Sequence, residues 1–194
     1  MKRIFLSFVL LFLMNAVFSQ TFMHGAGITV LGSSTGGNFS AGEGFTYSPR
    51  FNFIETENMS VSVGIPLSLG ISFSTNTYSS TYYGNEDPTS VGLVLNMPLI
   101  VNLNMGRGST KDNRQKFGYF VGAGFGYHHG DFIEEDYSGD TYGKSTNTFG
   151  PAANAGLRFG VGRQHKNIEV RFSYMKGLND EKLNIFGIGC LFNF

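Results

Sequence analysis

The feature that most constrains this chain is a strict alternation of side chains between residues 61 and 73. Every odd position in this stretch carries a bulky apolar side chain, and every even position carries serine, glycine or proline. The apolar positions are Val61, Val63, Ile65, Leu67, Leu69, Ile71 and Phe73. Because successive side chains of a strand point to opposite faces, the alternation predicts a β-strand with one apolar face and one face of small residues.

Seven further segments repeat this period of two. In the longest of them only Val94 and Ile100 break the apolar phase, and in the first His24 occupies an apolar position. The seven segments are residues 22–32, 45–53, 91–105, 117–128, 149–161, 168–174 and 186–194. Together with residues 61–73 they predict an all-β chain of eight strands. A ten-stranded alternative requires a hairpin hidden in one of the longer connections.

Strand length and composition together indicate a membrane-spanning barrel. Strands of soluble proteins average about 5 to 6 residues, whereas a tilted strand needs about 9 to 11 residues to cross a bilayer. Only 14% of the residues are charged, while glycine (27) and phenylalanine (20) are abundant. Small polar side chains suit the interior of a narrow barrel, and a sheet in lipid must close because open edges leave backbone groups unpaired. We therefore predict a closed antiparallel up-and-down transmembrane β-barrel with its bulky rows toward lipid.

Four prolines lie inside the predicted strands, although proline cannot donate a ladder hydrogen bond. They are Pro49, Pro66, Pro98 and Pro151. We expect a β-bulge at each, since a bulge accommodates an unpaired residue without ending the strand.

Residues 1–19 have the features of a secretory signal peptide. Lys2 and Arg3 precede an apolar run over residues 4–14, and Val17 and Ser19 are small enough for the positions that signal peptidase reads. We predict cleavage after Ser19 and one barrel domain over residues 20–194.

If the mature chain begins in the periplasm, alternating strands sort the connections into two sets. The periplasmic turns are then residues 55–59, 106–116 and 162–167, and the outer loops are residues 34–43, 74–90, 130–145 and a short turn near 179–182. The two longest loops are outer ones, as is usual in outer-membrane barrels.

Polar side chains in the inward phase form the first candidate site. They are Arg50, Asn102, Asn104, Arg158, Glu169 and Arg171. Three arginines repel one another unless Glu169 bridges them and amides, hydroxyls or water complete the shell. We expect a hydrogen-bonded cluster that fills the lumen, and the alternative is an anion-binding pocket or a narrow anion path. A general porin is disfavoured, because eight strands enclose little more than their own side chains.

The sequence gives little support for catalysis or a metal site. His128 and His129 precede an acidic stretch, but no serine motif stands beside them, and nucleophilic catalysis needs a serine bonded to an oriented base. The acidic residues are Asp131, Glu134, Glu135, Asp136 and Asp140, whose spacing is not that of an EF-hand. We expect no catalytic residue, cofactor or metal. The acidic loop is expected to be solvated, or bridged by cations to lipopolysaccharide phosphates, and the basic turn at 106–116 to be solvated.

The signal peptide, the eight alternating segments and the terminal "CLFNF" resemble the small outer-membrane β-barrel superfamily of OmpX-like and OmpA-barrel-like proteins. The strands "VGIPLSLGISF" and "NMPLIVNLNMG" look like the outer-membrane β-barrel domains common in Bacteroidota. The resemblance implies that the barrel-assembly machinery reads the C-terminal strand as an insertion signal, at Ile188, Phe192 and Phe194.

The expected function is therefore a non-enzymatic role in the cell outer membrane, as a structural or interaction protein with a side-chain-filled lumen and extracellular loops. Its expected partners are outer-membrane lipid, lipopolysaccharide, the assembly machinery and an unidentified protein at the outer loops, with no nucleic acid. One alternative is a narrow channel or small-solute binder that uses the inward arginines. Another is a soluble periplasmic barrel that binds an apolar ligand, which requires the bulky rows to face inward.

Overall fold

The computed structural model describes residues 21–35, 38–75, 89–135, 141–162, 165–179 and 182–194, so the predicted signal peptide lies outside the described residues. The strands are β1 (Thr21–Met23), β2 (Gly25–Thr35), β3 (Asn38–Tyr47), β4 (Arg50–Glu55), β5 (Met59–Gly64), β6 (Leu67–Thr75), β7 (Thr89–Gly106), β8 (Phe117–Glu135), β9 (Thr141–Gly160), β10 (Asn167–Lys176) and β11 (Asn184–Asn193). Within these ranges, no helix is long and apolar enough to cross a membrane.

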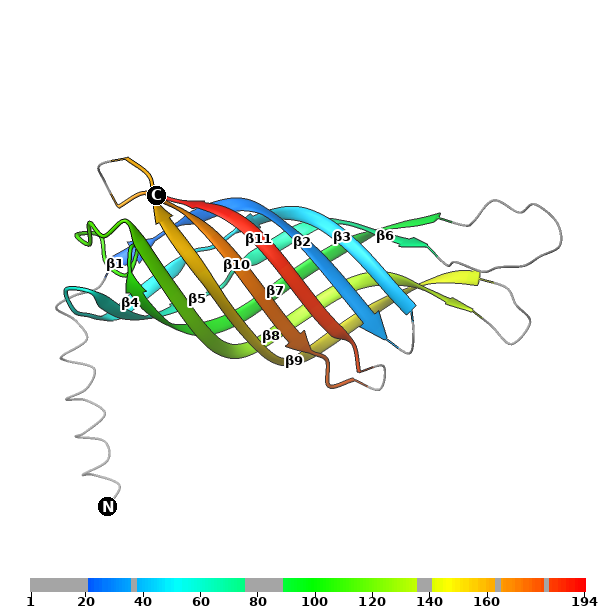
Figure 1. The fold of residues 1–194 in the computed structure, drawn as a ribbon. Helices are drawn as coiled ribbons and strands as arrows, with labels where there is room; N and C mark the ends of the chain where they lie inside the picture. Colours follow the sequence, from blue (N-terminus) through cyan, green and yellow to red (C-terminus); the bar gives the residue numbers. More distant parts are fainter. Residues whose placement is uncertain (1–20, 36–37, 76–88, 136–140, 163–164, 180–181) are drawn as a thin grey trace, which may run out of the picture.

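All of these strands belong to one antiparallel sheet, which closes because β7 pairs with β5 and β6 on one side and with β8 on the other. Three barrel strands are each divided in two, namely β1 with β2, β3 with β4, and β5 with β6. Counted this way, the sheet is a closed eight-stranded barrel (Figure 1). The predicted fold class and strand number are confirmed.

The register shows how the barrel accommodates its prolines. Pro66 and Pro98 lie across from each other, and the pairing on either side of them has the same register. The two prolines therefore leave a gap in the ladder without inserting a residue. The pairing also continues unshifted past Pro49 and through Pro151. The predicted bulges are wrong, and the register shift in the described strands lies between Asn52 and Ile54.

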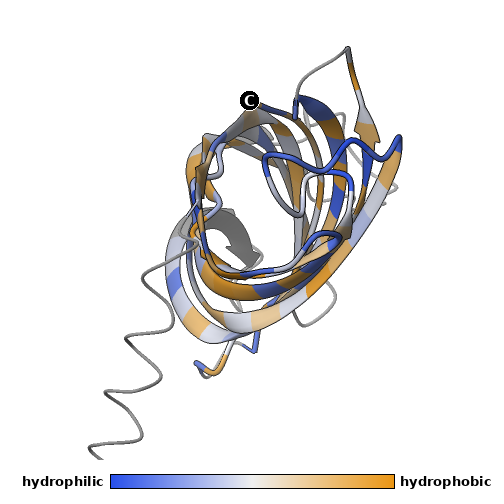
Figure 2. Cartoon of the chain, turned by 90° about the vertical axis from the view of Figure 1, so that its left-hand side faces the viewer, coloured by the Kyte–Doolittle hydropathy of each residue, from blue (hydrophilic) through white to orange (hydrophobic). Residues whose placement is uncertain are grey.

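The bulky rows of the alternation face outward. Ile28 is 68% exposed and Val91 is 62% exposed, while serines and asparagines at alternate positions are buried inside the barrel. Figure 2 looks along the barrel from the end that carries the C-terminus, and it shows the strands closing into a ring. A surface this apolar fits a lipid environment. The alternative of a soluble barrel with bulky rows inside is therefore wrong.

Aromatic side chains gather on the outer wall near both ends of the barrel. His24, Tyr47 and Phe194 lie in contact at the end of the barrel where β1 begins and β11 ends, which we call the terminal end. The pairs Tyr127–Phe149 and Tyr174–Phe186 lie toward the opposite end, which we call the loop end. Two aromatic bands flanking an apolar belt are typical of transmembrane barrels.

Two of the predicted outer loops are mostly strand. Only residues 36–37 separate β2 from β3, although residues 34–43 were expected to form a loop. Likewise β8 and β9 stay paired as far as Glu135 and Thr141, within the segment 130–145 that was expected to be a loop. Strands that continue beyond the belt no longer need an apolar face, so the alternation that identifies them in the sequence disappears. This hairpin lengthens two barrel strands and does not add a ninth and tenth.

Candidate functional site

Close to the end of the barrel where β10 begins, the lumen holds a buried ion cluster on β9 and β10. Arg158 and Glu169 are direct cross-strand partners, and Nε of Arg158 donates to Oε2 of Glu169 at 2.7 Å. Arg171 donates from Nε to Oε1 of the same carboxylate at 2.8 Å and also from Nη2. Asn193 of β11 donates to Oε2 at 3.0 Å. The Glu169 side chain, which is 0% exposed, therefore bridges two guanidinium groups, as the sequence suggested.

An inward-facing aromatic ring supports the same cluster. The Cζ atom of Arg158 lies 4.3 Å from the centre of the Phe120 ring, and that of Arg171 lies 5.6 Å from it. Guanidinium groups over an aromatic face gain a cation–π attraction. Gly156 makes room for the ring, because a Cβ there would lie 2.5 Å from Phe120. Phe120 was missed in the sequence, although it stands among glycines in the inward phase of its segment.

The turn between β7 and β8 folds into the terminal end of the barrel, and we call residues 107–110 the plug. The carbonyl oxygen of Gly108 accepts hydrogen bonds from Arg50 Nη2 at 2.6 Å and from Arg158 Nη1 at 3.3 Å. The carbonyl of Ser109 accepts from Asn52 Nδ2 at 2.8 Å and from Ser60 Oγ at 2.6 Å.

All four plug residues are buried, so the expectation of a solvated turn is wrong for this part. Backbone carbonyls of the turn serve as the acceptors that the inner guanidinium and amide groups need, which the side-chain pattern could not reveal. Gly108 has a φ of 72°, in the left-handed region that favours glycine. The rest of the turn is largely exposed, including Lys111, Arg114 and Lys116.

The structure places all six predicted lumen residues on the inner side of the sheet. Asn104 accepts from Arg158 Nη1 at 3.0 Å and donates to Ser62 at 2.9 Å, which ties β7 to the ion cluster. Arg50 is linked to the ion cluster through the carbonyl oxygen of Gly108, which accepts hydrogen bonds from both Arg50 and Arg158. Asn102 lies next to the network, where its buried side-chain oxygen has no hydrogen-bond partner in the protein.

An apolar layer lies between the ion cluster and the buried polar side chains Asn96, His128 and Thr148 toward the loop end. Ile100, Ala152, Met175, Leu183 and Ile185 form a buried apolar cluster there. Ile100 faces inward as part of this cluster, which explains why an apolar side chain interrupts the small and polar row of residues 91–105 at this position.

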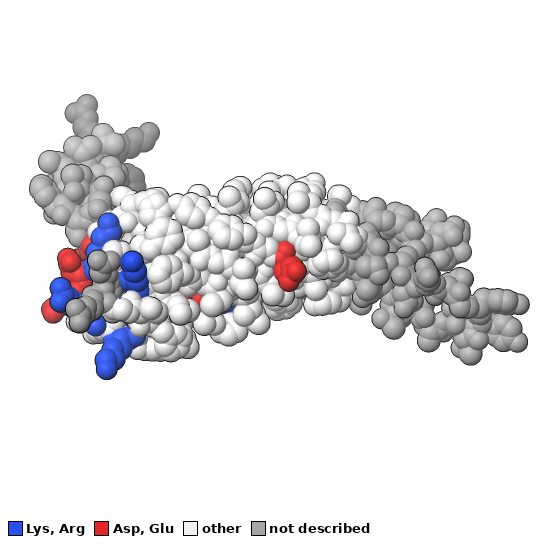
Figure 3. Space-filling model, turned by 90° about the horizontal axis from the view of Figure 1, so that it is seen from above, with Lys and Arg blue, Asp and Glu red and all other residues white. Residues whose placement is uncertain are grey.

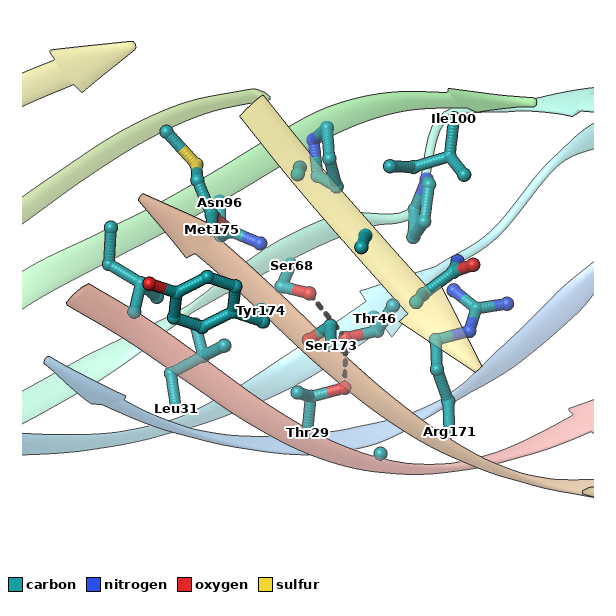
Figure 4. Close-up of a pocket in the computed structure, with 17 residues that line it drawn as sticks. Thr29, Leu31, Thr46, Ser68, Asn96, Ile100, Arg171, Ser173, Tyr174 and Met175 are labelled. Carbon is teal, nitrogen blue, oxygen red and sulfur yellow. Dashed lines mark hydrogen bonds between the residues drawn. The ribbon is translucent and has the colours of Figure 1, made fainter. Parts of the chain in front are cut away.

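Between this apolar layer and the ion cluster runs a chain of three hydroxyl groups, with Thr29 to Thr46 and Thr46 to Ser68 each at 2.7 Å. These hydroxyls and Arg171 line a cavity of about 30 Å³, shown in Figure 4.

The histidine pair does not form one site. His128 is buried inside the barrel with Nδ1 3.3 Å from Asn96 Oδ1. His129 points outward, with Nδ1 2.9 Å from Asn147 Oδ1. Their opposite directions follow from adjacent positions in a strand. Over the described ranges no group of three or more His, Cys, Asp or Glu side chains could hold a metal ion, whereas Asp136, Ser138 and Asp140 lie outside the described residues.

The C-terminal strand closes the barrel against β2. The backbone N–H of Phe194 donates to the carbonyl of His24 at 3.0 Å, and the two rings stack with their centres 5.9 Å apart. His24 Nδ1 lies 2.6 Å from the Tyr47 hydroxyl oxygen. Ile188, Phe192 and Phe194 all point outward. Their role in barrel insertion remains a prediction.

Charged side chains are sparse on the wall and gather at the terminal end (Figure 3). There, partial burial and the cations Lys111, Arg107 and Lys166 lower the pKa of His165. Among the described residues of the wall, Glu43 of β3 is an exposed acid flanked by Val30 and Ile71 on the neighbouring strands.

Comparison with known proteins supports the fold. No protein-family model and no curated protein matches the chain. Among solved structures, Ail, the attachment invasion locus protein of Yersinia pestis, in complex with the heparin analogue sucrose octasulfate, has a TM-score of 0.54 at 14% identity over 91% of this chain and 100% of that one. Neisserial surface protein A has a TM-score of 0.54 at 10% identity over 90% of this chain and 97% of that one.

At such identities the likeness concerns the fold alone. It agrees with the OmpX-like resemblance found in the sequence, whereas the Bacteroidota-type resemblance stays a prediction. A closed barrel with a lipid-facing belt between aromatic bands is the transmembrane form found in outer membranes. The chain is therefore a small eight-stranded outer-membrane β-barrel, and its predicted location in the cell outer membrane is confirmed.

Proposed function

We propose that this protein is a non-enzymatic outer-membrane barrel that is closed to solutes and acts through its loop end as an interaction protein. The terminal end then lies in the periplasm and the loop end outside the cell. This proposal rests on the observation that side chains and the plug fill the lumen. The plug, the Arg158–Glu169–Arg171 cluster and the apolar cluster occupy successive levels of the barrel.

The closed lumen disfavours the channel alternative. A solute path would have to cross Glu169 and its bonded guanidinium groups, where Arg158 is 1% exposed. It would also have to pass the plug, where the carbonyl oxygen of Gly108 is bonded to Arg50 of β4 and to Arg158 of β9 on the far side of the barrel. Opening such a path requires breaking several charge-assisted hydrogen bonds together, each about twice as strong as a neutral one.

The loop end offers the surface for interaction. Pairing of β8 with β9 continues from the Tyr127–Phe149 contact to Glu135 and Thr141. At about 3.3 Å per residue this extends the hairpin by about 26 Å along the strands beyond the aromatic band. In Figure 1 these two strands run past the end of the barrel.

The charge of this hairpin points to its partner class. Residues 131–140 contain five acidic residues and no lysine or arginine. Such a segment attracts cationic groups, or divalent cations that bridge it to lipopolysaccharide phosphates. It is less suited to a sulfated glycan such as the analogue bound by Ail, because like charges repel. We further propose that insertion depends on the barrel-assembly machinery reading Ile188, Phe192 and Phe194.

Conductance in planar bilayers tests the closed state. We expect no steady current from the wild-type protein. A variant with Arg158→Ala and Glu169→Ala together should conduct, because it removes two fully buried side chains of the ion cluster, and it shows that the assay detects passage. A steady wild-type current would overturn the proposal in favour of a narrow channel.

A hairpin exchange tests the interaction role. Replacing residues 131–140 by glycine and serine should leave the heat-modifiable barrel intact and abolish magnesium-dependent binding to vesicles that contain lipopolysaccharide. Replacing residues 56–58 at the terminal end in the same way serves as the matched control and should leave binding unchanged. Equal binding by both variants would refute a role for the hairpin.

A further inference from the structure

The lumen carries more positive charge than its protein groups neutralise. Arg50, Arg158 and Arg171 face a single buried carboxylate, Glu169, which pairs with the last two. Among the described residues, no carboxylate lies within ion-pair distance of Arg50. Excess charge away from water is costly unless an ion of opposite sign or ordered polar groups accompany it.

Arg171 directs an unused donor toward a cavity. Its Nε and Nη2 are bonded to Glu169, and Nη2 also reaches Ser48 at 3.0 Å. Its buried Nη1 has no hydrogen-bond partner in the protein. Arg171 lines the cavity of about 30 Å³ at the middle of the barrel (Figure 4).

The opposite side of this cavity offers a second donor. Thr29, Thr46 and Ser68 form a chain in which two hydrogen bonds use two of the three hydroxyl protons. The third proton, at one end of the chain, has no acceptor in the protein. Asn154 also lines the cavity, with its side-chain oxygen buried and unpaired, and a half-turn of its amide would present an N–H group instead.

We propose that this cavity is a binding site for a small monovalent anion of the size of chloride, held by Arg171 Nη1 and the hydroxyl chain. The cavity has room for a particle of about the size of water or chloride. A water molecule would satisfy the same donors, but it leaves the charge excess in place. An anion offsets part of this excess, so the charge balance favours the anion.

Unfolding of the purified protein in detergent micelles, followed against sodium chloride, tests the site. Sodium gluconate at equal ionic strength serves as the reference, because gluconate is too large to enter. We expect the wild-type midpoint to rise with chloride beyond its rise with gluconate. The variant Arg171→Gln should lower the apparent chloride affinity about tenfold or more, as expected for the loss of a charge-assisted hydrogen bond. Arg114→Gln, on the exposed part of the turn after the plug, is the control and should behave as wild type.

Two further measurements keep the outcome decisive. Thr29→Val removes a hydroxyl at nearly constant volume, so it tests the site if Arg171→Gln fails to fold, and it should weaken the chloride effect as well. Crystals soaked in sodium bromide should show an anomalous peak within hydrogen-bond distance of Arg171 Nη1. Identical chloride and gluconate responses, or a cavity that holds water and no bromide, would overturn the proposal.

Discussion

Replacing Glu169 by glutamine should strongly destabilise the barrel. The Glu169 carboxylate accepts hydrogen bonds from two guanidinium groups and from Asn193. Glutamine keeps the size of the side chain but removes the negative charge, and its amide N–H groups would meet other donors. Arg158 and Arg171 would then share the lumen with no anionic protein partner.

The expected loss follows from the burial of the pair. Breaking a buried ion pair by removing one partner costs about 3–5 kcal/mol, because the other charge is left uncompensated. Glu169 is fully buried and Arg158 nearly so, which places this site in that range. We expect such a decrease in the free energy of unfolding, measured by urea titration in detergent micelles or lipid vesicles. Glu57→Gln, an exposed acid in the β4–β5 turn, should change it by less than about 0.5 kcal/mol.

Restoring the charge balance should rescue the variant in part. The double variant Glu169→Gln with Arg171→Met also removes one cation that has lost its carboxylate partner. Its free energy of unfolding should therefore decrease by less than the sum of the decreases in the two single variants. A loss below about 1 kcal/mol for Glu169→Gln alone would show that water already compensates these charges, and the reasoning would then be refuted.

Three further predictions concern packing, assembly and the lipid face. Gly156→Ala should cost about 1–3 kcal/mol in urea titration, because the new Cβ would lie 2.3 Å from the backbone oxygen of Val170 and 2.5 Å from the Phe120 ring, and Phe120→Leu in the same chain should relieve the second contact alone. Phe194→Ser should lower the heat-modifiable fraction in outer-membrane extracts far more than Phe186→Ser, which removes an aromatic ring from the loop end of the same strand. The outward-facing thiol of Cys190 should react with a lipid-soluble maleimide and resist a membrane-impermeant one, and equal reaction with both would argue against burial in lipid.

The sequence predicted the barrel because the alternation is imposed by the two environments on either side of the sheet. Residues 61–73 show it without a break, so strand identity and facing were readable there. Val94 and Ile100 are apolar residues in the row that faces inward, and both side chains are buried inside the barrel. The interior of this barrel is polar near the terminal end and polar again at Asn96, His128 and Thr148 toward the loop end, with an apolar layer between. A rule that assigns only small or polar residues to the inside misses that layer.

Other features depend on contacts between distant segments. The plug is held by hydrogen bonds to the backbone carbonyl groups of Gly108 and Ser109. A pattern of side chains in the sequence does not indicate which backbone carbonyl groups accept such bonds. The bulges expected at the prolines are absent because Pro66 and Pro98 face each other, which can be seen only once the register is known. The inward phase of the strands put Arg158, Glu169 and Arg171 on one face, and the contacts of Glu169 with both guanidinium groups follow from the register.

The whole arrangement depends on bulky rows that contact lipid and inner rows that fill the barrel. The chain contains no tryptophan, so a single introduced indole reports its surroundings without background. Phe125→Trp places the indole on the outer wall, and Phe120→Trp places it in the lumen on the same strand. Lipids brominated on their acyl chains should quench the fluorescence at position 125 strongly and leave that at position 120 nearly unchanged. Equal quenching at both positions, or stronger quenching at position 120, would contradict the arrangement of the two faces.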